Sequence, residues 1–423
     1  MAASNSLLLK SSVQNSTSAK TIVDQKEAAS AISRSLNAYG DSEDEESDLD
    51  EDEDQEPDAN GVVNSKTSWK SMRKEALLMK APVASNPVTE ENYKELCGII
   101  SNEHDYSLLR DDGIFQGAGS VLTAYNITVL EEEHKTPLAF NILIHTDVEL
   151  AKHVLRLIYR PHNFYCLHLD QKIKDEIRNE ITDFVQYTEN IQIIPKIDSI
   201  RVLWGEKSVL DAQLKCAKAS LKTKIQWKYW INLTGQEFPL KTNLEIVRII
   251  SSLRRKSLIE ASTDVTKKRI PKQKLPFPVT WLEGPTFILV QRSFIEFLFN
   301  SEMVRILYKS YHDLSLPEEQ FYQTVYFNEV FKAPDSCPLR SSMDKGSNHL
   351  RYVIWKKCDD STLNEKCILG YHHLSNLTNS PKLFANKFHY GYQPLAYRCL
   401  IDWYLNLTDN PRDFSKEFKH IEC

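Results

Sequence analysis

Short apolar runs alternate with amphipathic stretches between residues 137 and 233. The run PLAFNILIH (137–145) has the length of a buried strand, and in the following stretch (147–159) Leu150, Val154 and Ile158 share one helical face. The pattern then repeats, with strands expected at 164–170, 191–195 and 227–233 and helices at 173–187 and 207–221. Such alternation predicts an α/β domain whose mostly parallel sheet is covered by helices on both faces.

Beyond residue 245 the pattern is weaker. The stretch at 284–300 is typical of a strand, a turn and a helix, and the stretch at 316–328 predicts a helix that begins at Pro317 with acids in its first turn. Ligands of parallel sheets bind at the carboxyl ends of the strands. Asp170 and the turn Thr234-Gly235-Gln236-Glu237 follow two of the expected strands. Both are therefore expected to face the ligand, with Gln236 and Glu237 shaping its site.

The N-terminal part has a different composition. Residues 41–58 hold 13 acidic groups among 18 positions and no aromatic residue, so charge repulsion opposes collapse and predicts a disordered segment. We assign residues 1–92 to an acidic tail or stem and residues 93–423 to the folded domain. Without these 13 acids the net charge changes from −6 to +7, which suits a phosphate-bearing ligand. Nucleic-acid binding is not expected, because no dense basic stripe with interleaved aromatics and no zinc-finger spacing is present.

Apolar segments and cysteines are the two sequence features that indicate the cellular location of the protein. No segment reaches the roughly 18 consecutive apolar residues of a membrane span, and no secretion signal is visible, so the sequence taken literally predicts a soluble chain. None of the cysteines forms a CxxC pair, so the common zinc-binding spacings are absent. The number of cysteines therefore argues against a purely cytosolic protein. The eight cysteines are at 97, 166, 216, 337, 358, 367, 399 and 423. Asn232 begins an Asn-Leu-Thr triplet within an apolar strand, where we expect it to be buried and unmodified.

Three stretches together resemble one family. IYRPHNFYCLHLDQK, YWINLTGQEFPLKTNLEIVR and KLFANKF are similar to the core-2/I-branching β-1,6-N-acetylglucosaminyltransferases, with the peptide xylosyltransferases as nearest relatives. The resemblance covers about residues 93–410. It implies a GT-A-like, Rossmann-type fold and inverting transfer from UDP-N-acetylglucosamine to a 6-hydroxyl of an O-glycan or polylactosamine. It also implies a Golgi location with a membrane anchor, which this sequence does not show.

The resemblance implies three disulfides. The family positions fall on the pairs Cys97 with Cys399, Cys166 with Cys216, and Cys358 with Cys367, the last nine residues apart. Both positions of a fourth family bridge hold other residues here. Cys337 and Cys423 are left without family partners. The alternative is that all eight are ordinary buried thiols.

The resemblance also assigns the donor site. Asp170 is expected to hydrogen-bond the nucleoside, although an aspartate there also suits a strand end and a helix cap. Lys387 in LFANKF is expected to hold the diphosphate. Asn364 stands where the family has a partner arginine, and Lys366 is the candidate replacement. Because HLDQK has one acid where metal-dependent enzymes have Asp-X-Asp, neither a metal nor another cofactor is expected.

The expected general base is Glu319 in LPEEQFYQT. A position in the first turn of a helix would favour its charged form, whereas burial against Phe321, Tyr322 or a bound sugar would raise its pKa. Glu318 is the competitor, and only the motif alignment separates the two. Acids at helix starts are also common caps.

Acceptor residues are matched as well. Glu260, Lys268 and Trp355 lie near family positions that hold the acceptor sugar, and the flat ring of Trp355 suits stacking on a sugar, although a core role would suit it equally. The implied partners are a UDP-sugar and a glycoprotein O-glycan. The alternatives are a UDP-xylose-dependent protein xylosyltransferase and a catalytically silent glycan-binding member of the same fold, the latter motivated by Asn364.

Overall fold

A computed structural model provides the structure. It describes residues 97–98, 128–253, 256–336, 349–355, 358, 362–363, 366–414 and 418. The acidic run at 41–58 and the rest of the predicted tail lie outside these residues, as do Cys337, Asn364 and Cys423.

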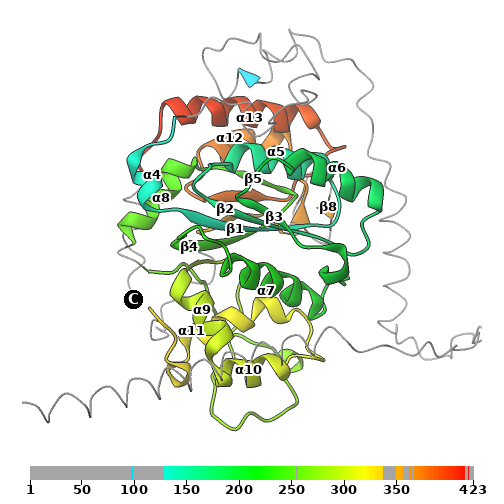
Figure 1. Ribbon diagram of the computed structural model, residues 1–423, viewed down its shortest axis with the longest axis vertical. Helices are drawn as coiled ribbons and strands as arrows, with labels where there is room; N and C mark the ends of the chain where they lie inside the picture. Colours follow the sequence, from blue (N-terminus) through cyan, green and yellow to red (C-terminus); the bar gives the residue numbers. More distant parts are fainter. Residues whose placement is uncertain are drawn as a thin grey trace, which may run out of the picture. The chain divides into compact units, whose positions relative to one another are not determined.

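A five-stranded sheet forms the centre of the described part, in the order β3-β2-β1-β4-β6 (Figure 1). Its strands are β1 (Leu138–Ile144), β2 (Phe164–Leu169), β3 (Ile191–Ile193), β4 (Tyr229–Thr234) and β6 (Leu289–Gln291). Strand β1 pairs in parallel with β2 and β4, and β2 pairs in parallel with β3. Only β6 runs antiparallel, beside β4. The predicted mostly parallel sheet is therefore confirmed.

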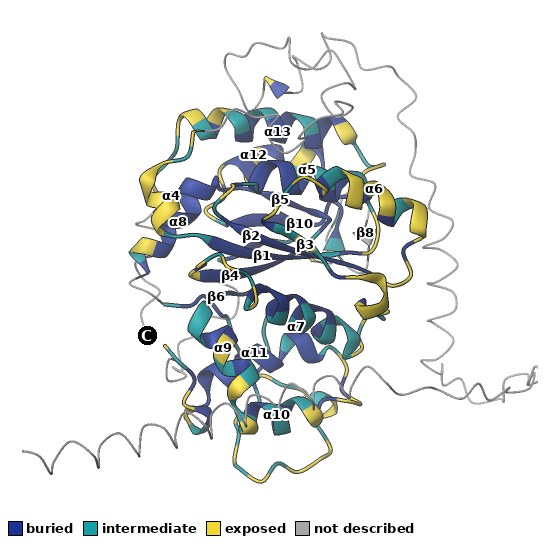
Figure 2. Cartoon of the chain, in the orientation of Figure 1, coloured by how far each residue is buried: buried dark blue, intermediate teal, exposed yellow. Residues whose placement is uncertain are grey.

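Helices cover both faces of this sheet, with α5, α6 and α8 on one side and α7, α9, α10 and α11 on the other (Figure 1). Their bounds are α5 (Val148–Ile158), α6 (Asp175–Val185), α7 (Ser208–Ser220), α8 (Asn243–Ser252), α9 (Arg292–Asn300), α10 (Glu302–Lys309) and α11 (Phe321–Phe327). Because successive strand residues point to opposite faces, Phe140 and Ile142 pack in one core and Ala139 in the other. Strand β2 is buried throughout and β1, β4 and β6 along most of their length, whereas β3 at the edge of the sheet is partly exposed (Figure 2).

A second, smaller sheet joins parts of the chain that are far apart in sequence. It has the order β5-β10-β7, with β5 (Glu237–Pro239), β10 (Phe384–Asn386) and β7 (Arg351–Tyr352). Helices α12 (Leu374–Thr378) and α13 (Pro394–Asp409) share an apolar core with it. A two-stranded ladder of β8 (Thr362–Leu363) and β9 (Lys366–Cys367) follows β7 in the chain.

The region 316–328 differs from its prediction as one helix. It forms a single 3₁₀ turn, η6 (Pro317–Glu319), and then the separate helix α11, with Gln320 between them at φ −129°. Glu319 therefore belongs to a short turn and not to the first turn of an α-helix, so the helix dipole has little part in its charge state. The other 3₁₀ turns within the described ranges are η4 (Lys196–Asp198), η5 (Lys267–Arg269), η7 (Glu329–Phe331) and η8 (Tyr371–His373).

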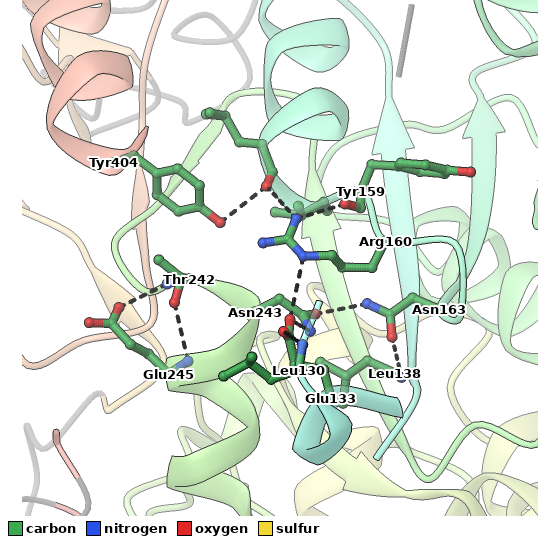
Figure 3. A network of polar contacts seen from close by, with 12 residues as sticks. Leu130, Glu133, Leu138, Tyr159, Arg160, Asn163, Thr242, Asn243, Glu245 and Tyr404 are labelled. Carbon is green, nitrogen blue, oxygen red and sulfur yellow. Dashed lines mark hydrogen bonds and ion pairs between the residues drawn. The ribbon is translucent and has the colours of Figure 1, made fainter. Parts of the chain in front are cut away.

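A buried polar network ties helix α4 (Glu131–Lys135) to the sheet and to α8 (Figure 3). The Glu133 carboxylate lies 3.4 Å from Arg160 Nε and accepts a hydrogen bond of 2.7 Å from Asn243 Nδ2. Asn163 donates to Asn243 Oδ1 at 2.8 Å and accepts from the Leu138 backbone N–H at 2.8 Å. These contacts fix the start of β1 against the loop that precedes β2.

All three expected disulfides are present. Cys97 is bonded to Cys399 on α13, Cys166 of β2 to Cys216 of α7, and Cys358 to Cys367 of β9. Asn232 is buried in β4, as predicted, and its amide bonds to both Thr286 and Ile288. Among the described residues no helix has the length and apolar character needed to cross a bilayer.

Candidate active site

Asp170 lies at the carboxyl end of β2, beside the end of β1. Its backbone N–H donates to the Ile144 carbonyl at 2.8 Å, which continues the parallel ladder by one residue. Its carboxylate accepts from the Lys172 backbone N–H at 2.8 Å, and Lys172 Nζ lies 3.6 Å from the other oxygen. The residue is only 2% exposed. A carboxylate fixed in this way is a suitable acceptor for a ligand hydroxyl or N–H group.

The turn after β4 lies at the other side of β1. Gly235 donates its N–H to the Leu143 carbonyl at 2.9 Å, and a Cβ there would lie 2.9 Å from Ala151 Cβ of helix α5. Glycine is needed at this position because any side chain would push the turn away from the helix. The turn is thus packed between β1 and α5.

Glu237 does not face the ligand, in contrast to the prediction. It is fully buried, and its Oε2 lies 2.7 Å from Arg351 Nε. Its Oε1 accepts from the Thr234 N–H at 3.0 Å and from the Thr234 hydroxyl at 3.2 Å. Arg351 also donates to the Asn232 carbonyl at 2.6 Å. Glu237 therefore joins the central sheet to the small sheet instead of shaping a sugar site. The partner, Arg351, is 114 residues away, so no local pattern announces it.

Lys387 follows directly after β10. It is 9% exposed, and its carbonyl accepts from the Leu369 N–H at 2.8 Å. Burial and, to a smaller extent, the positive charge of Lys366 lower the pKa of Lys387 to about 8, and the charge of Asp147 opposes this change. The two lysines predicted for the donor are thus brought together, and both are partly desolvated cations. Such cations attract an anionic ligand more strongly than exposed ones do.

Lys366 lies on β9, paired with Trp355. The two residues form an isolated antiparallel bridge, and Lys366 Nζ is 4.8 Å from the centre of the Trp355 ring. Burial lowers the pKa of Lys366, whereas the charges of Glu319, Glu237 and Glu318 raise it. Trp355 remains 52% exposed. A large exposed aromatic ring beside a cation is accessible to a ligand, and stacking of Trp355 on the acceptor sugar stays a prediction.

Glu319 is held from two sides. Its carbonyl accepts from the Gly284 N–H at 2.8 Å, and its Oε2 lies 3.2 Å from Arg269 Nη2. Burial raises the pKa of Glu319, and Arg269 and Lys366 act in the opposite direction. Arg269 also contacts Glu283 at 3.1 Å. The Glu319 side chain remains 29% exposed, so its carboxylate is accessible to a ligand.

Glu318, the competing acid, has different surroundings. It is 5% exposed, and burial together with the neighbouring Glu319 charge raises its pKa to about 7. Its charge also raises the pKa of the buried Tyr322 hydroxyl. Glu318 is therefore buried in the interior, whereas Glu319 is partly exposed and contacts Arg269.

The remaining two predicted acceptor residues are not brought into direct contact with this group. The Glu260 carboxylate accepts from the His349 N–H, and burial raises its pKa to about 7. Its carbonyl is packed against Gly284, where a Cβ would lie 2.1 Å away. Lys268 is exposed on η5, and its neighbour Arg269 makes the contact to Glu319. The acceptor roles of Glu260 and Lys268 stay predictions, and Arg269 is a cation of this group that the sequence pattern did not single out.

Charged groups run from η6 to the end of β2. The charge of Glu319 raises the pKa of Lys366, and the charge of Lys366 lowers the pKa of Lys387. At the end of β1, the charge of Lys387 lowers the pKa of His145 and that of Asp170 raises it. Asp147, which the sequence reasoning did not select, belongs to the same series. Among the described residues no cluster of His, Cys, Asp or Glu has the arrangement of a metal site. The series provides an acid, two lysines and an aspartate, and the aspartate lies at the carboxyl end of β2, where parallel sheets commonly bind ligands.

The fold and these groups define a glycosyltransferase of the GT-A-like kind. The chain belongs to the Core-2/I-Branching enzyme family, whose sequence profile it matches over residues 138–378, more than half of its length. It is 30% identical over 302 residues to a human N-acetyllactosaminide β-1,6-N-acetylglucosaminyl-transferase, covering 64% of this chain and 73% of the relative. It is 28% identical over 306 residues to the mouse β-1,3-galactosyl-O-glycosyl-glycoprotein β-1,6-N-acetylglucosaminyltransferase 4, covering 65% and 67%.

Proposed function

We propose that the protein transfers N-acetylglucosamine from UDP-N-acetylglucosamine to a 6-hydroxyl of an O-glycan or polylactosamine, with inversion and without a metal ion. The observation that carries the proposal is the electrostatic connection of Glu319 to Lys366 and of Lys366 to Lys387. A base and two cations in one group are what such a reaction needs. The names of the two relatives support the choice of sugar and linkage.

The proposed reaction is a single displacement. The acceptor oxygen forms a bond to the anomeric carbon while the bond from that carbon to the diphosphate oxygen breaks, and the hydroxyl proton passes to the Glu319 carboxylate. The departing UDP keeps the electron pair and gains negative charge. Lys366 and Lys387 offset that charge in a partly desolvated site, where fixed charges act more strongly than in water. Asp170 would then hold the nucleoside and Trp355 the acceptor ring, with Glu260 and Lys268 as outer acceptor residues.

The compartment is part of the same proposal. Three disulfides are typical of proteins that fold in an oxidising compartment. They support a location in the secretory pathway, with the Golgi lumen as the place where such acceptors are made.

Incorporation of radiolabelled sugar tests the proposal. The full chain is incubated with UDP-N-acetylglucosamine or UDP-xylose, with O-glycan and N-acetyllactosamine acceptors, in excess chelator. We expect incorporation from UDP-N-acetylglucosamine, a sharply higher donor KM for Lys387→Ala, and no change for Lys222→Ala, an exposed lysine after α7. Incorporation only from UDP-xylose would support the xylosyltransferase alternative, and none from either donor the silent glycan-binding alternative. Loss of activity in chelator and recovery with manganese would contradict the metal-independent mechanism.

A further inference from the structure

Asp147 has an unusual place at the end of β1. It precedes the first residue of helix α5 with φ 49°, in the left-handed region. A non-glycine residue in this region costs roughly 1–3 kcal/mol unless the surroundings fix it, and such residues cluster at functional sites. An aspartate before a helix ordinarily caps it by accepting from the first N–H groups. The Asp147 side chain makes no such bond.

The carboxylate is instead directed to the segment that carries Lys387. Gln236 Nε2 donates a hydrogen bond to Asp147 Oδ2, and His389 Nε2 lies 3.9 Å from Oδ1. The Gln236 carbonyl accepts from the Phe388 N–H at 3.0 Å. Asp147 is thus tied to residues 388 and 389, directly after Lys387. Its side chain is only 8% exposed, so water screens its charge weakly.

We propose that Asp147 is a resident counter-ion of Lys387 that competes with the diphosphate and so weakens the binding of UDP. The inference rests on the proposed function, in which Lys387 binds the diphosphate. An anion that enters this site gains the attraction of two lysines but is also repelled by Asp147. The carboxylate offsets part of the lysine charge when the site is empty and works against any anion that occupies it.

The repulsion discriminates between substrate and product. The diphosphate of a UDP-sugar carries about two negative charges, whereas free UDP carries close to three at neutral pH because its terminal phosphate has a second pKa of about 6. Repulsion by Asp147 is therefore greater for the product. Since product release limits turnover in many enzymes, this residue would favour release of UDP over loss of the donor.

The experiment uses Asp147→Asn in the full chain. Asparagine keeps the shape and still accepts from Gln236 Nε2, and it tolerates the left-handed backbone. By titration calorimetry we expect UDP to bind about fivefold more tightly, UDP-N-acetylglucosamine to gain less, and uridine to bind unchanged. Turnover should show a lower kcat and stronger inhibition by UDP. Asp147→Gly, which suits φ 49° and also removes the charge, should change UDP binding in the same direction.

Lys387→Ala distinguishes failure of the proposed diphosphate role of Lys387 from failure of the Asp147 inference. If Lys387→Ala leaves UDP affinity unchanged, the diphosphate role of Lys387 is wrong and the Asp147 inference is wrong with it. If Lys387→Ala weakens UDP while both Asp147 variants bind UDP no more tightly than the wild type, only the counter-ion inference is wrong. A gain for uridine as large as that for UDP would also contradict it, because uridine carries no charge for Asp147 to repel.

Discussion

Arg269 Nη2 lies 3.2 Å from Oε2 of Glu319. The guanidinium favours the charged carboxylate and so opposes the rise in the pKa of Glu319 that burial causes. In Arg269→Gln that pKa should rise, so that the base stays protonated to higher pH. We expect the acidic limb of the kcat/KM profile to move to higher pH, with activity recovering on the alkaline side.

Substitution of Glu283 provides a control in which the pKa of Glu319 is expected to change in the opposite direction. The negative charge of Glu283 raises the pKa of Glu319, so Glu283→Gln should move the same limb to lower pH. Equal profiles for the wild type and both variants would show that Glu319 is not the group whose ionisation limits the reaction.

The base assignment predicts a large and selective loss. Glu319→Gln keeps the size of the side chain but cannot accept the hydroxyl proton, and positioned bases typically contribute about 10²- to 10⁴-fold to the rate. We expect transfer to fall by a factor in that range while UDP affinity stays near that of the wild type. Glu318→Gln should lose much less, because Glu318 is buried in the interior. If Glu318→Gln abolishes transfer and Glu319→Gln does not, the two roles are reversed.

The buried ion pair predicts a loss of stability. Glu237→Gln would leave Arg351 charged and fully buried without its counter-ion, which typically costs about 3–5 kcal/mol of unfolding free energy. Denaturant unfolding measures this. Glu132→Gln is the matched control, since Glu132 pairs with Arg248 at 3.0 Å with its side chain 51% exposed, and such pairs contribute less than about 1 kcal/mol. Similar losses in both variants would show that burial of the Glu237 pair has no energetic consequence.

The buried charge of Lys387 is expected to lower stability while it supports donor binding. The pKa of Lys387 falls from 10.5 to about 8, so holding it charged at pH 7 costs up to about 3 kcal/mol. Lys387→Met should therefore raise the free energy of unfolding below pH 8 while donor binding is lost. The gain should shrink as pH rises from 8 toward 10.5, because the folded wild type then also carries a neutral lysine. A variant that is less stable than the wild type at pH 7 would contradict this account.

Alternation of apolar runs was sufficient to predict the central sheet, because each strand and its covering helix are neighbours in the sequence. Strand β1 and helix α5 lie within three residues of their predicted bounds. The small sheet could not be predicted in this way. Its strands have two or three residues, and β5 and β10 pair across more than 140 positions.

The candidate site shows the same division. Asp170 and Gly235 could be placed from their positions at strand ends, and Lys366, Lys387 and Glu319 from motif resemblance. The partners that set their charge state come from other parts of the chain. Arg269 reaches Glu319 across 50 residues, and Arg351 reaches Glu237 across 114. No periodicity encodes such pairs, because they depend on how finished elements pack together.

Lys366 immediately precedes Cys367, which is bonded to Cys358 nine positions earlier in the chain. One of the two cations proposed to hold the leaving group is therefore anchored by a disulfide bond, which forms only after translation. A newly made chain carries this lysine without that covalent link until its thiols are oxidised. Full donor affinity would then be acquired during maturation, and the compartment that oxidises the chain would determine when the enzyme begins to work.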